Sequence, residues 1–420
     1  MPTSNHPQPS LTQLLAELES AVRAGNRQRA TQLEQLILQQ LKADSDERDA
    51  VERRVRELMQ RLDRPAAQPD IRFRSSSSGA DGNVRSGSSP ADSDDAIYPV
   101  WFGTNRKPTA DGKGFTGERH NHLTRGRVNV HVPEAHRFGE TGSSFWQKLK
   151  RWDWRDDQLR LRDITRLERD AFFAEVQQRL GERQAGEPGH ALLFLHGYLT
   201  TFEDAAIRAA QIGVDLQAPA TAFFSWPSRG QVAAYPADEA SIEASERLIT
   251  EFLTEFTTNC GAEKVHVIAH SMGNRGLLRA LQRIAANAQT QGKVRFGQIF
   301  LAAPDVDRDL FLDLARLYKE HSDRTTLYAS KADLPVHLSS KVHDAPRAGY
   351  FTPYTVAPGL LDTVAVPDFN IDLLGHSYFA QAEALLHDIF DLMRNNQNPA
   401  QRQRIAPDFD GTTSFWKIKR

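Results

Sequence analysis

The sequence predicts an α/β fold in which a mostly parallel sheet is flanked by helices, with a separate helical module in front of it. Short apolar segments alternate with amphipathic ones from residue 191 onward, and a Ser/Gly/Asp-rich stretch precedes residue 96. The residues before that stretch repeat leucines at helical spacing. We therefore predict four parts: a helical module at 1–70, a flexible linker at 71–95, the α/β domain at 96–395 and a C-terminal tail at 396–420.

The composition is that of a soluble globular protein. Of 420 residues, 40% are hydrophobic and 25% are charged, and the formal net charge is -2. This charge offers no general attraction to nucleic acid or to membrane surfaces. The lone Cys260 cannot form an internal disulfide, which fits a reducing compartment. Neither a signal peptide nor an apolar run long enough to span a bilayer is visible, so we expect a cytoplasmic protein.

The N-terminal module is predicted to contain three helices between residues 10 and 63. Gly25-Asn26 separates the first two, and Pro65 closes the third. About fifty residues form only a marginal core. One interpretation is a small bundle that packs on itself. The other is a module for self-association or for docking a protein partner, with residues 1–70 as the contact region.

The α/β domain is predicted from alternating strands and helices. The expected strands are 97–102, 127–132, 191–195, 221–225, 264–269, 298–303, 325–330 and 363–366. The expected helices are 203–214, 238–256, 272–288, 308–319 and 377–393, and the charged stretch 143–187 also reads as helical. Right-handed crossovers between parallel strands place such helices on both faces of the sheet.

The strongest chemical signal is Ala269-His270-Ser271-Met272-Gly273, which lies between an apolar strand and an amphipathic helix. In this context the G-x-S-x-G pattern is the nucleophile elbow of the α/β-hydrolase fold. Small residues two before and two after the serine let strand and helix approach each other. Alanine at 269 in place of glycine is a mild departure. We predict Ser271 as the nucleophile.

A second signal, Leu195-His196-Gly197-Tyr198, ends an earlier strand, where an α/β-hydrolase supplies an oxyanion donor. The expected donors are the backbone N–H groups of Tyr198 and Met272, and Gly197 permits a close approach of the backbone. Four residues are expected to shape the substrate pocket: His196, Gly197, Trp226 and His270.

The catalytic acid should follow the serine in the sequence, after a later strand. Asp333, directly after the strand at 325–330, is the predicted acid. Asp305 is its alternate, although it suits the N-cap of the next helix equally well. The non-catalytic interpretation of Asp333 is a turn residue before Pro335.

The catalytic base should come later still, in a loop that can return to the serine. His376, just before the final helix, is the predicted base. His337 and His343 are alternates, but no strand separates them from Asp333. His387 falls within a predicted helix and is expected to be a surface or packing residue.

Neither a metal nor a cofactor is expected. His120-Asn121-His122 lacks further ligands at helical spacing, and no phosphate-binding or dinucleotide-binding glycine motif is present.

Seven motifs in one order resemble an uncharacterised bacterial branch of the α/β-hydrolase superfamily, over about residues 96–395. They are Val100–Arg106 (V-W-F-G-T-N-R), Val132-Pro133 with His136, Phe194–Tyr198, Phe224–Ser228, His270–Asn274 (H-S-M-G-N), Ala303–Asp305 and Gly375–Tyr378. The resemblance implies the fold and a triad of Ser271, Asp333 and His376. It implies no particular substrate and does not extend to residues 1–95.

The predicted function is a serine hydrolase that cleaves a carboxylic ester or related acyl bond through an acyl-enzyme. Esterase, lipase, thioesterase, amidase and acyltransferase activities share this machinery. The expected substrate is a small or lipid-like acyl compound. The alternative is a non-catalytic or partner-activated binding or scaffold protein, because a fold alone does not fix a function.

Overall fold

A computed structural model gives the structure of the chain and describes residues 14–15, 17–18, 21–22, 27–40, 51, 55, 96–132, 159–183, 186–230, 234–330, 345–350, 354–366 and 379–419. By its internal contacts the chain divides into two units, Met1–Asp95 and Ala96–Arg420. None of the helices in the described ranges is both long and apolar enough to cross a membrane.

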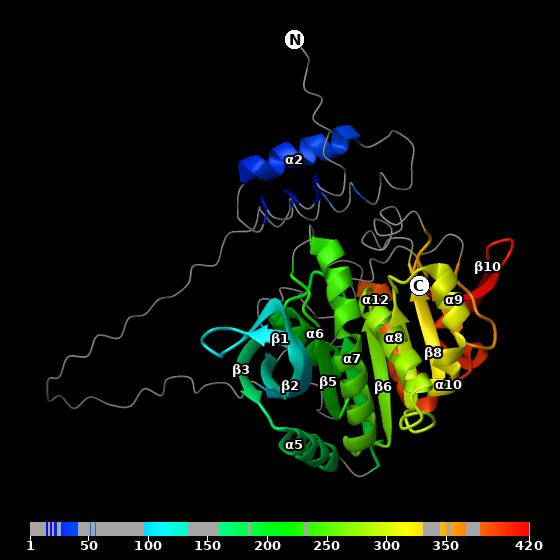
Figure 1. Cartoon of the computed structure of the whole chain (residues 1–420). Helices are drawn as coiled ribbons and strands as arrows, with labels where there is room; N and C mark the ends of the chain where they lie inside the picture. Colours follow the sequence, from blue (N-terminus) through cyan, green and yellow to red (C-terminus); the bar gives the residue numbers. More distant parts are fainter. Residues whose placement is uncertain are drawn as a thin grey trace, which may run out of the picture. The chain divides into compact units, whose positions relative to one another are not determined.

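The first unit contains helix α2 (Arg27–Gln40), drawn in blue in Figure 1, and further helical residues between 14 and 22 and at 51 and 55. Apolar side chains at helical spacing are buried in it: Leu14, Leu15, Leu18, Ala30, Leu33, Ile37, Val51 and Val55. Leu36 of helix α2 is instead 42% exposed. Arg29 of α2 pairs with Glu17 at 2.5 Å. The leucine pattern thus produces packed helices.

The second unit is built on one sheet, in the order β10-β11-β9-β8-β7-β6-β4-β5-β1-β2-β3 among the described residues. Its strands are β1 (Ala96–Pro108), β2 (Phe115–Val132), β3 (Arg160–Arg166), β4 (His190–Leu195), β5 (Ala220–Ser225), β6 (Lys264–His270), β7 (Phe296–Ala302), β8 (Ser322–Ala329), β9 (Asp362–Ala365), β10 (Ile405–Phe409) and β11 (Ser414–Ile418). Pairing is parallel from β1 to β11 and antiparallel only at the margins, β1–β2–β3 and β10–β11. The predicted mostly parallel sheet is confirmed.

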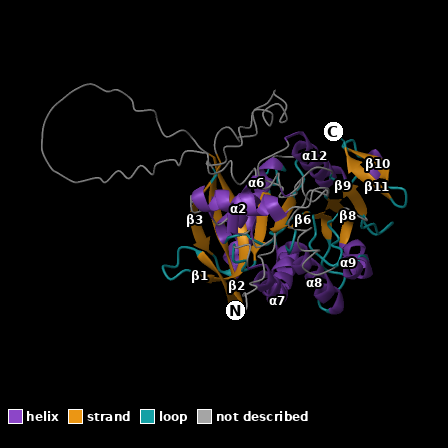
Figure 2. Ribbon diagram, turned by 90° about the horizontal axis from the view of Figure 1, so that it is seen from above, coloured by secondary structure: helices purple, strands orange, loops and turns teal. Residues whose placement is uncertain are grey.

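Helices cover both faces of this sheet (Figure 2). One layer holds α5 (Arg169–Gly181), α7 (Tyr235–Asn259), α8 (Gly273–Ala286), α9 (Arg308–Leu314) and α10 (Arg316–His321). The other holds α6 (Phe202–Asp215) and α12 (Phe379–Asn395). The prediction of flanking helices is confirmed, although the single helix expected at 308–319 is divided into α9 and α10.

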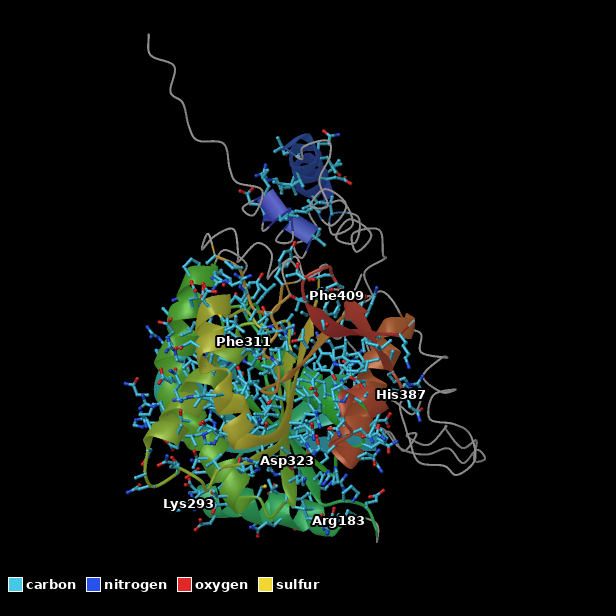
Figure 3. All side chains as sticks on the ribbon, turned by 90° about the vertical axis from the view of Figure 1, so that its right-hand side faces the viewer. Arg183, Lys293, Phe311, Asp323, His387 and Phe409 are labelled. Carbon is cyan, nitrogen blue, oxygen red and sulfur yellow. The ribbon has the colours of Figure 1, made fainter. Side chains whose placement is uncertain are left out.

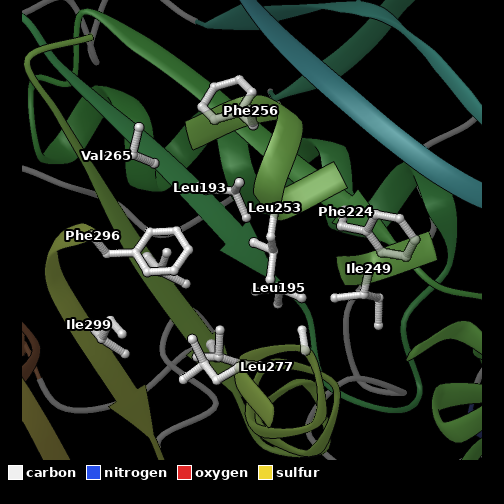
Figure 4. Close-up of a cluster of buried hydrophobic side chains, with 14 of the residues drawn as sticks. Leu193, Leu195, Phe224, Ile249, Leu253, Phe256, Val265, Leu277, Phe296 and Ile299 are labelled. Carbon is white, nitrogen blue, oxygen red and sulfur yellow. The ribbon is translucent and has the colours of Figure 1, made fainter. Parts of the chain in front are cut away.

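The apolar central strands are explained by these two layers. Along β4, Leu193 and Leu195 enter the core beneath α7 and α8, whereas Leu192 and Phe194 enter the core beneath α6. A strand that is buried on both faces reads as a continuous apolar run, because neither set of alternating side chains meets water. Figure 4 shows the first core, where the β4 leucines lie among side chains of α7 such as Leu253.

The edge at β1–β3 differs from the sequence prediction. The segment between the expected strands 97–102 and 127–132 is itself largely strand, because β1 and β2 continue to a short turn where Pro108 pairs with Phe115. Within 143–187, read as helical, only Arg169–Gly181 is a described helix, and Arg160–Arg166 is strand β3. Strand β3 lies at the sheet edge with no fully buried residue. Because β3 pairs with β2 alone among the described strands and buries no residue fully, it can carry charged side chains along its length.

The segment predicted as a tail, 396–420, contains two strands of the sheet, Ile405–Phe409 and Ser414–Ile418. Strands β10 and β11 form a hairpin that extends the sheet beyond β9, and Phe409 marks this hairpin in Figure 3. Arg402, just before β10, is buried and pairs with Asp388 of α12, which also accepts a hydrogen bond from the Tyr328 hydroxyl at 2.8 Å. A buried pair and an added strand thus tie these residues to the core.

Replacing Asp388 with alanine should lower the free energy of unfolding by about 3 kcal/mol or more, because Arg402 loses its main partner in a buried site. Urea unfolding measures the loss. The matched control is Asp408→Ala, which removes an exposed pair with Lys417 and should cost less than about 1 kcal/mol. Equal midpoints for the two variants would show that the buried pair does not anchor the hairpin.

Candidate active site

Ser271 stands at the turn between β6 and α8 with a left-handed backbone, φ 48°. This conformation is uncommon for a residue with a side chain, and such strain persists only where the surroundings enforce it. Here the Ser271 N–H donates to the carbonyl of Ala302 at 2.9 Å, at the end of the neighbouring strand β7. The predicted strand–turn–helix setting of the serine is present.

Small residues around Ser271 make the turn sterically feasible. A Cβ on Gly273 would lie 2.6 Å from the carbonyl oxygen of His196 and 2.7 Å from that of Leu195, so only glycine fits there. Ala269 is completely buried between its partners on β4 and β7. Alanine at that position, where the pattern usually has glycine, is therefore accommodated.

Asn274 braces the turn, a role that sequence reasoning missed. Its side-chain amide donates to the carbonyls of Ala269 and Ser271, each at 3.0 Å, and the side chain is fully buried. The backbone N–H groups of Asn274 and Asp305 also donate to the Ser271 carbonyl. A polar residue on the buried face of an amphipathic helix was the signal available, because buried amides need hydrogen-bond partners.

The loop after β4 lies directly against the serine. A Cβ on Gly197 would lie 3.0 Å from Cβ of Ser271 and 2.9 Å from Nδ1 of His270, so the backbone of this loop reaches Ser271. Tyr198 follows, and its ring meets Tyr235 edge to face at 5.4 Å between centroids. The geometry brings the segments of the two expected oxyanion donors together, but the donors themselves remain a prediction.

His196 and Trp226 form the buried support of this loop. Their rings stack at 5.1 Å, and the indole N–H of Trp226 donates to the His196 carbonyl at 2.8 Å. Nδ1 of His196 lies 2.7 Å from the Gly197 carbonyl, which can only accept, so Nδ1 carries the proton and Nε2 faces the Ser225 hydroxyl. Burial, with a smaller contribution from the nearby Arg106 charge, holds the pKa of His196 well below its usual value. A neutral imidazole with a fixed tautomer suits a structural role.

Asp305, the alternate acid, is engaged by other groups. Its buried carboxylate accepts a hydrogen bond from the Tyr235 hydroxyl at 2.5 Å and lies 3.5 Å from Arg275 and 3.4 Å from Arg347. Arg275 also donates to the Asp305 backbone carbonyl. These contacts join α7, α8 and the segment after β7, and they favour a structural role for Asp305.

The predicted acid and base, and two alternates for the base, lie outside the described residues: Asp333, His376, His337 and His343. Strands β8 and β9, which precede those segments, run parallel to β6 and β7. The carboxyl ends of β8 and β9 therefore lie on the same side of the sheet as the carboxyl end of β6, which Ser271 follows. His387, in contrast, is described: it is buried in α12, and burial lowers its pKa to about 3, as expected of a packing residue.

Within the described ranges, no three His, Cys, Asp or Glu side chains are grouped to hold a metal ion. The rings of His120 and His122 lie 5.1 Å apart on β2, and no third side chain of these types joins them among the described residues. The absence of a cofactor stays a prediction.

Comparison with known proteins gives one informative match. The model of a family described as alpha/beta hydrolase of unknown function (DUF900) matches residues 169–394. An uncharacterized protein from Bacillus cereus ATCC 10987 aligns over 92% of this chain and 99% of its own, with 10% identity and a TM-score of 0.32, too low to carry an argument. A search of the curated proteins finds no significant match.

Gly273→Ala should lower the free energy of unfolding by about 2–3 kcal/mol, because the new methyl group would meet two carbonyl oxygens of the β4 segment. Gly181→Ala is the control, since a Cβ there meets nothing within 4 Å. Denaturant unfolding of both variants measures the difference, and the control should stay within about 1 kcal/mol of the wild type. A Gly273 variant as stable as the control would contradict the tight elbow.

Proposed function

The chain belongs to a family of alpha/beta hydrolases of unknown function, and from that premise we propose that it is a serine hydrolase with Ser271 as its nucleophile. The bond that it cleaves is a carboxylic ester or a related acyl bond. Thioesters and amides react through the same acyl-enzyme and belong to the same proposal.

The observation that carries this proposal is the conformation of Ser271. Its φ is 48°. The Asn274 amide maintains this conformation by donating hydrogen bonds to two backbone carbonyls of the turn, and Gly273 maintains it by its close packing against the β4 segment. Strain of this kind costs about 1–3 kcal/mol and clusters at functional sites. A serine that served only to connect β6 with α8 would need no such enforcement.

In the proposed reaction, the Ser271 hydroxyl attacks the substrate carbonyl while His376 takes its proton. Asp333 holds the imidazole in the required tautomer and stabilises its charged form. The backbone N–H groups of Met272 and Tyr198 bind the oxyanion. They are aimed before the reaction begins, so stabilising the new charge requires no reorganisation. When the tetrahedral intermediate collapses, the bond to the leaving group breaks and His376 gives its proton to that group. Water then attacks the acyl-enzyme with His376 as base, and the carboxylic acid leaves as Ser271 regains its proton.

The surroundings of the serine support an acyl substrate with an apolar part. The rings of Tyr198 and Tyr235 are half-buried and meet edge to face beside the β4 loop. The Tyr235 hydroxyl is engaged by Asp305 and Arg275, which fixes that ring. A small or lipid-like acyl compound fits such an aromatic wall, and residues 1–70 remain the proposed region for self-association or for a protein partner.

Ser271→Ala should abolish labelling by a fluorophosphonate probe, because the probe forms its bond with the activated serine oxygen. Hydrolysis of p-nitrophenyl esters of short to medium chain length should fall by about 10⁴-fold or more in Ser271→Ala and in His376→Ala. Ser322→Ala changes an equally buried serine at the start of β8 and should keep both signals. Labelling that survives in Ser271→Ala would reject this nucleophile, and a folded wild type without labelling would favour a binding or partner-activated protein.

Asp333→Asn and Asp305→Asn separate the two candidate acids. The first should reduce ester hydrolysis by about 10³–10⁴-fold, because the imidazole loses its orienting carboxylate. The second should mainly lower stability, because Arg275 and Arg347 lose a buried anion. Probe labelling per folded molecule and urea unfolding measure both effects. The opposite pattern would transfer the acid role to Asp305.

A further inference from the structure

The motif Val100–Arg106 on β1 has no part in the proposed chemistry, yet its last residue ends beside the β4 loop. Arg106 is only 1% exposed. Its guanidinium donates to the backbone carbonyl of Thr200 at 2.7 Å and to that of Ser228 at 2.8 Å. It also donates to the Ser225 hydroxyl at 2.8 Å and, more weakly, to the Thr116 carbonyl at 3.4 Å.

These acceptors lie on segments that meet at the carboxyl end of the sheet. Thr200 belongs to the loop after β4, and Ser225 and Ser228 belong to the end of β5 and the loop that follows. No carboxylate in the described ranges forms a salt bridge with Arg106. One planar cation thus serves as a clamp between two loops, a geometry that the fixed fork of an arginine provides and a lysine does not.

Ser228 holds the other side of Thr200. The Ser228 hydroxyl accepts a hydrogen bond from the Thr200 N–H at 3.1 Å and donates to the buried carboxylate of Asp238 at 2.6 Å. Both backbone groups of Thr200 are therefore fixed. Its neighbour Leu199 has a left-handed backbone, φ 60°, which a side chain seldom adopts without outside constraint. Tyr198, the proposed oxyanion donor, is only two residues before Thr200.

The rest of the motif delivers Arg106 to this position. A Cβ on Gly103 would lie 2.5 Å from the Phe252 ring, so glycine lets α7 pack closely on β1. The Thr104 hydroxyl donates to the Ser225 carbonyl at 2.6 Å, and the Asn105 amide donates to the Ser245 hydroxyl of α7 at 2.9 Å. The residues from Gly103 to Arg106 thus fasten β1 to α7, to β5 and to the loops after β4 and β5.

From this arrangement we infer that Arg106 is a positioning residue of the catalytic site, which fixes the loop Gly197–Thr200 so that the Tyr198 N–H is aimed at the oxyanion. The inference deepens the proposed function and rests on it. An oxyanion donor is effective only when it is held in place before charge develops. A displacement of about 1 Å can cost about 10²-fold in rate. Arg106 acts through the loop and does not touch the substrate.

The test compares Arg106→Lys and Arg106→Met with Arg402→Lys, which changes an arginine of similar burial at the C-terminal hairpin. Each full-length variant is assayed at a temperature at which its thermal unfolding curve shows it to be folded. Labelling by a fluorophosphonate should slow by about tenfold in Arg106→Lys and by up to about 100-fold in Arg106→Met. Arg402→Lys should label at the wild-type rate per folded molecule.

Two readouts separate positioning from a loss of structure. In ester hydrolysis, kcat should fall while KM stays within about twofold, because the donor acts in the transition state. Hydrogen exchange of the peptide 196–202 should be faster in both Arg106 variants and unchanged in Arg402→Lys. If the Arg106 variants do not fold, Ser228→Ala releases the same loop and should give the same two changes.

Unchanged exchange in this peptide would overturn the clamp. Faster exchange with wild-type labelling would overturn the link from the clamp to catalysis. A folded wild type that is never labelled would reject the proposed function and the catalytic role of Arg106 with it, while the exchange measurement would still decide whether Arg106 holds the loop.

Discussion

The close approach of three backbones at Ser271 is the constraint on which the site depends. The end of β6, the start of α8 and the loop after β4 meet so closely that a methyl group on Gly273 or Gly197 would overlap its neighbours. Core packing on both faces of the sheet brings these segments together, and Asn274 satisfies the carbonyls that the sharp turn exposes. The strain at Ser271 is therefore maintained by the whole central sheet.

Around this contact, buried polar groups fix the loops at the carboxyl end of the strands. Asp305 joins α7, α8 and the segment after β7, while Arg106 and Asp238 join the loops after β4 and β5. Buried charges are costly unless they are hydrogen-bonded, so each network has few alternative arrangements. Burial lowers the pKa of Arg106 to about 10, which still leaves the group charged at neutral pH. The same charge helps to keep His196 neutral.

Local patterns predicted the parts of this fold that local physics determines. The apolar strands and the elbow at Ser271 were visible because strand, turn and helix follow one another directly between Lys264 and Ala286. The clamp was not visible, since Arg106 meets Thr200 and Ser228 only after the sheet has formed. Strand β3 was misread because an edge strand needs no apolar face.

The C-terminal hairpin was misread as a tail for a related reason. Strands β10 and β11 are short. Pro407 interrupts the apolar pattern within β10, and Gly411 lies between the two strands. Their position depends on the pairing of β11 with β9 and on the ion pair between Arg402 and Asp388. Both are tertiary contacts that a local sequence pattern does not contain. For the acid and base, order along the chain was the only guide, and Asp333 and His376 remain predictions.

The order of the clamp along the chain has a consequence for biosynthesis. Every residue that contacts the Arg106 guanidinium, and Asp238 behind them, precedes Ser271 in the sequence. Strands β1, β4 and β5 are neighbours in the sheet, so the clamp joins segments that are all synthesised before β6. The clamped loop is thus made before the turn at Ser271 that packs against it.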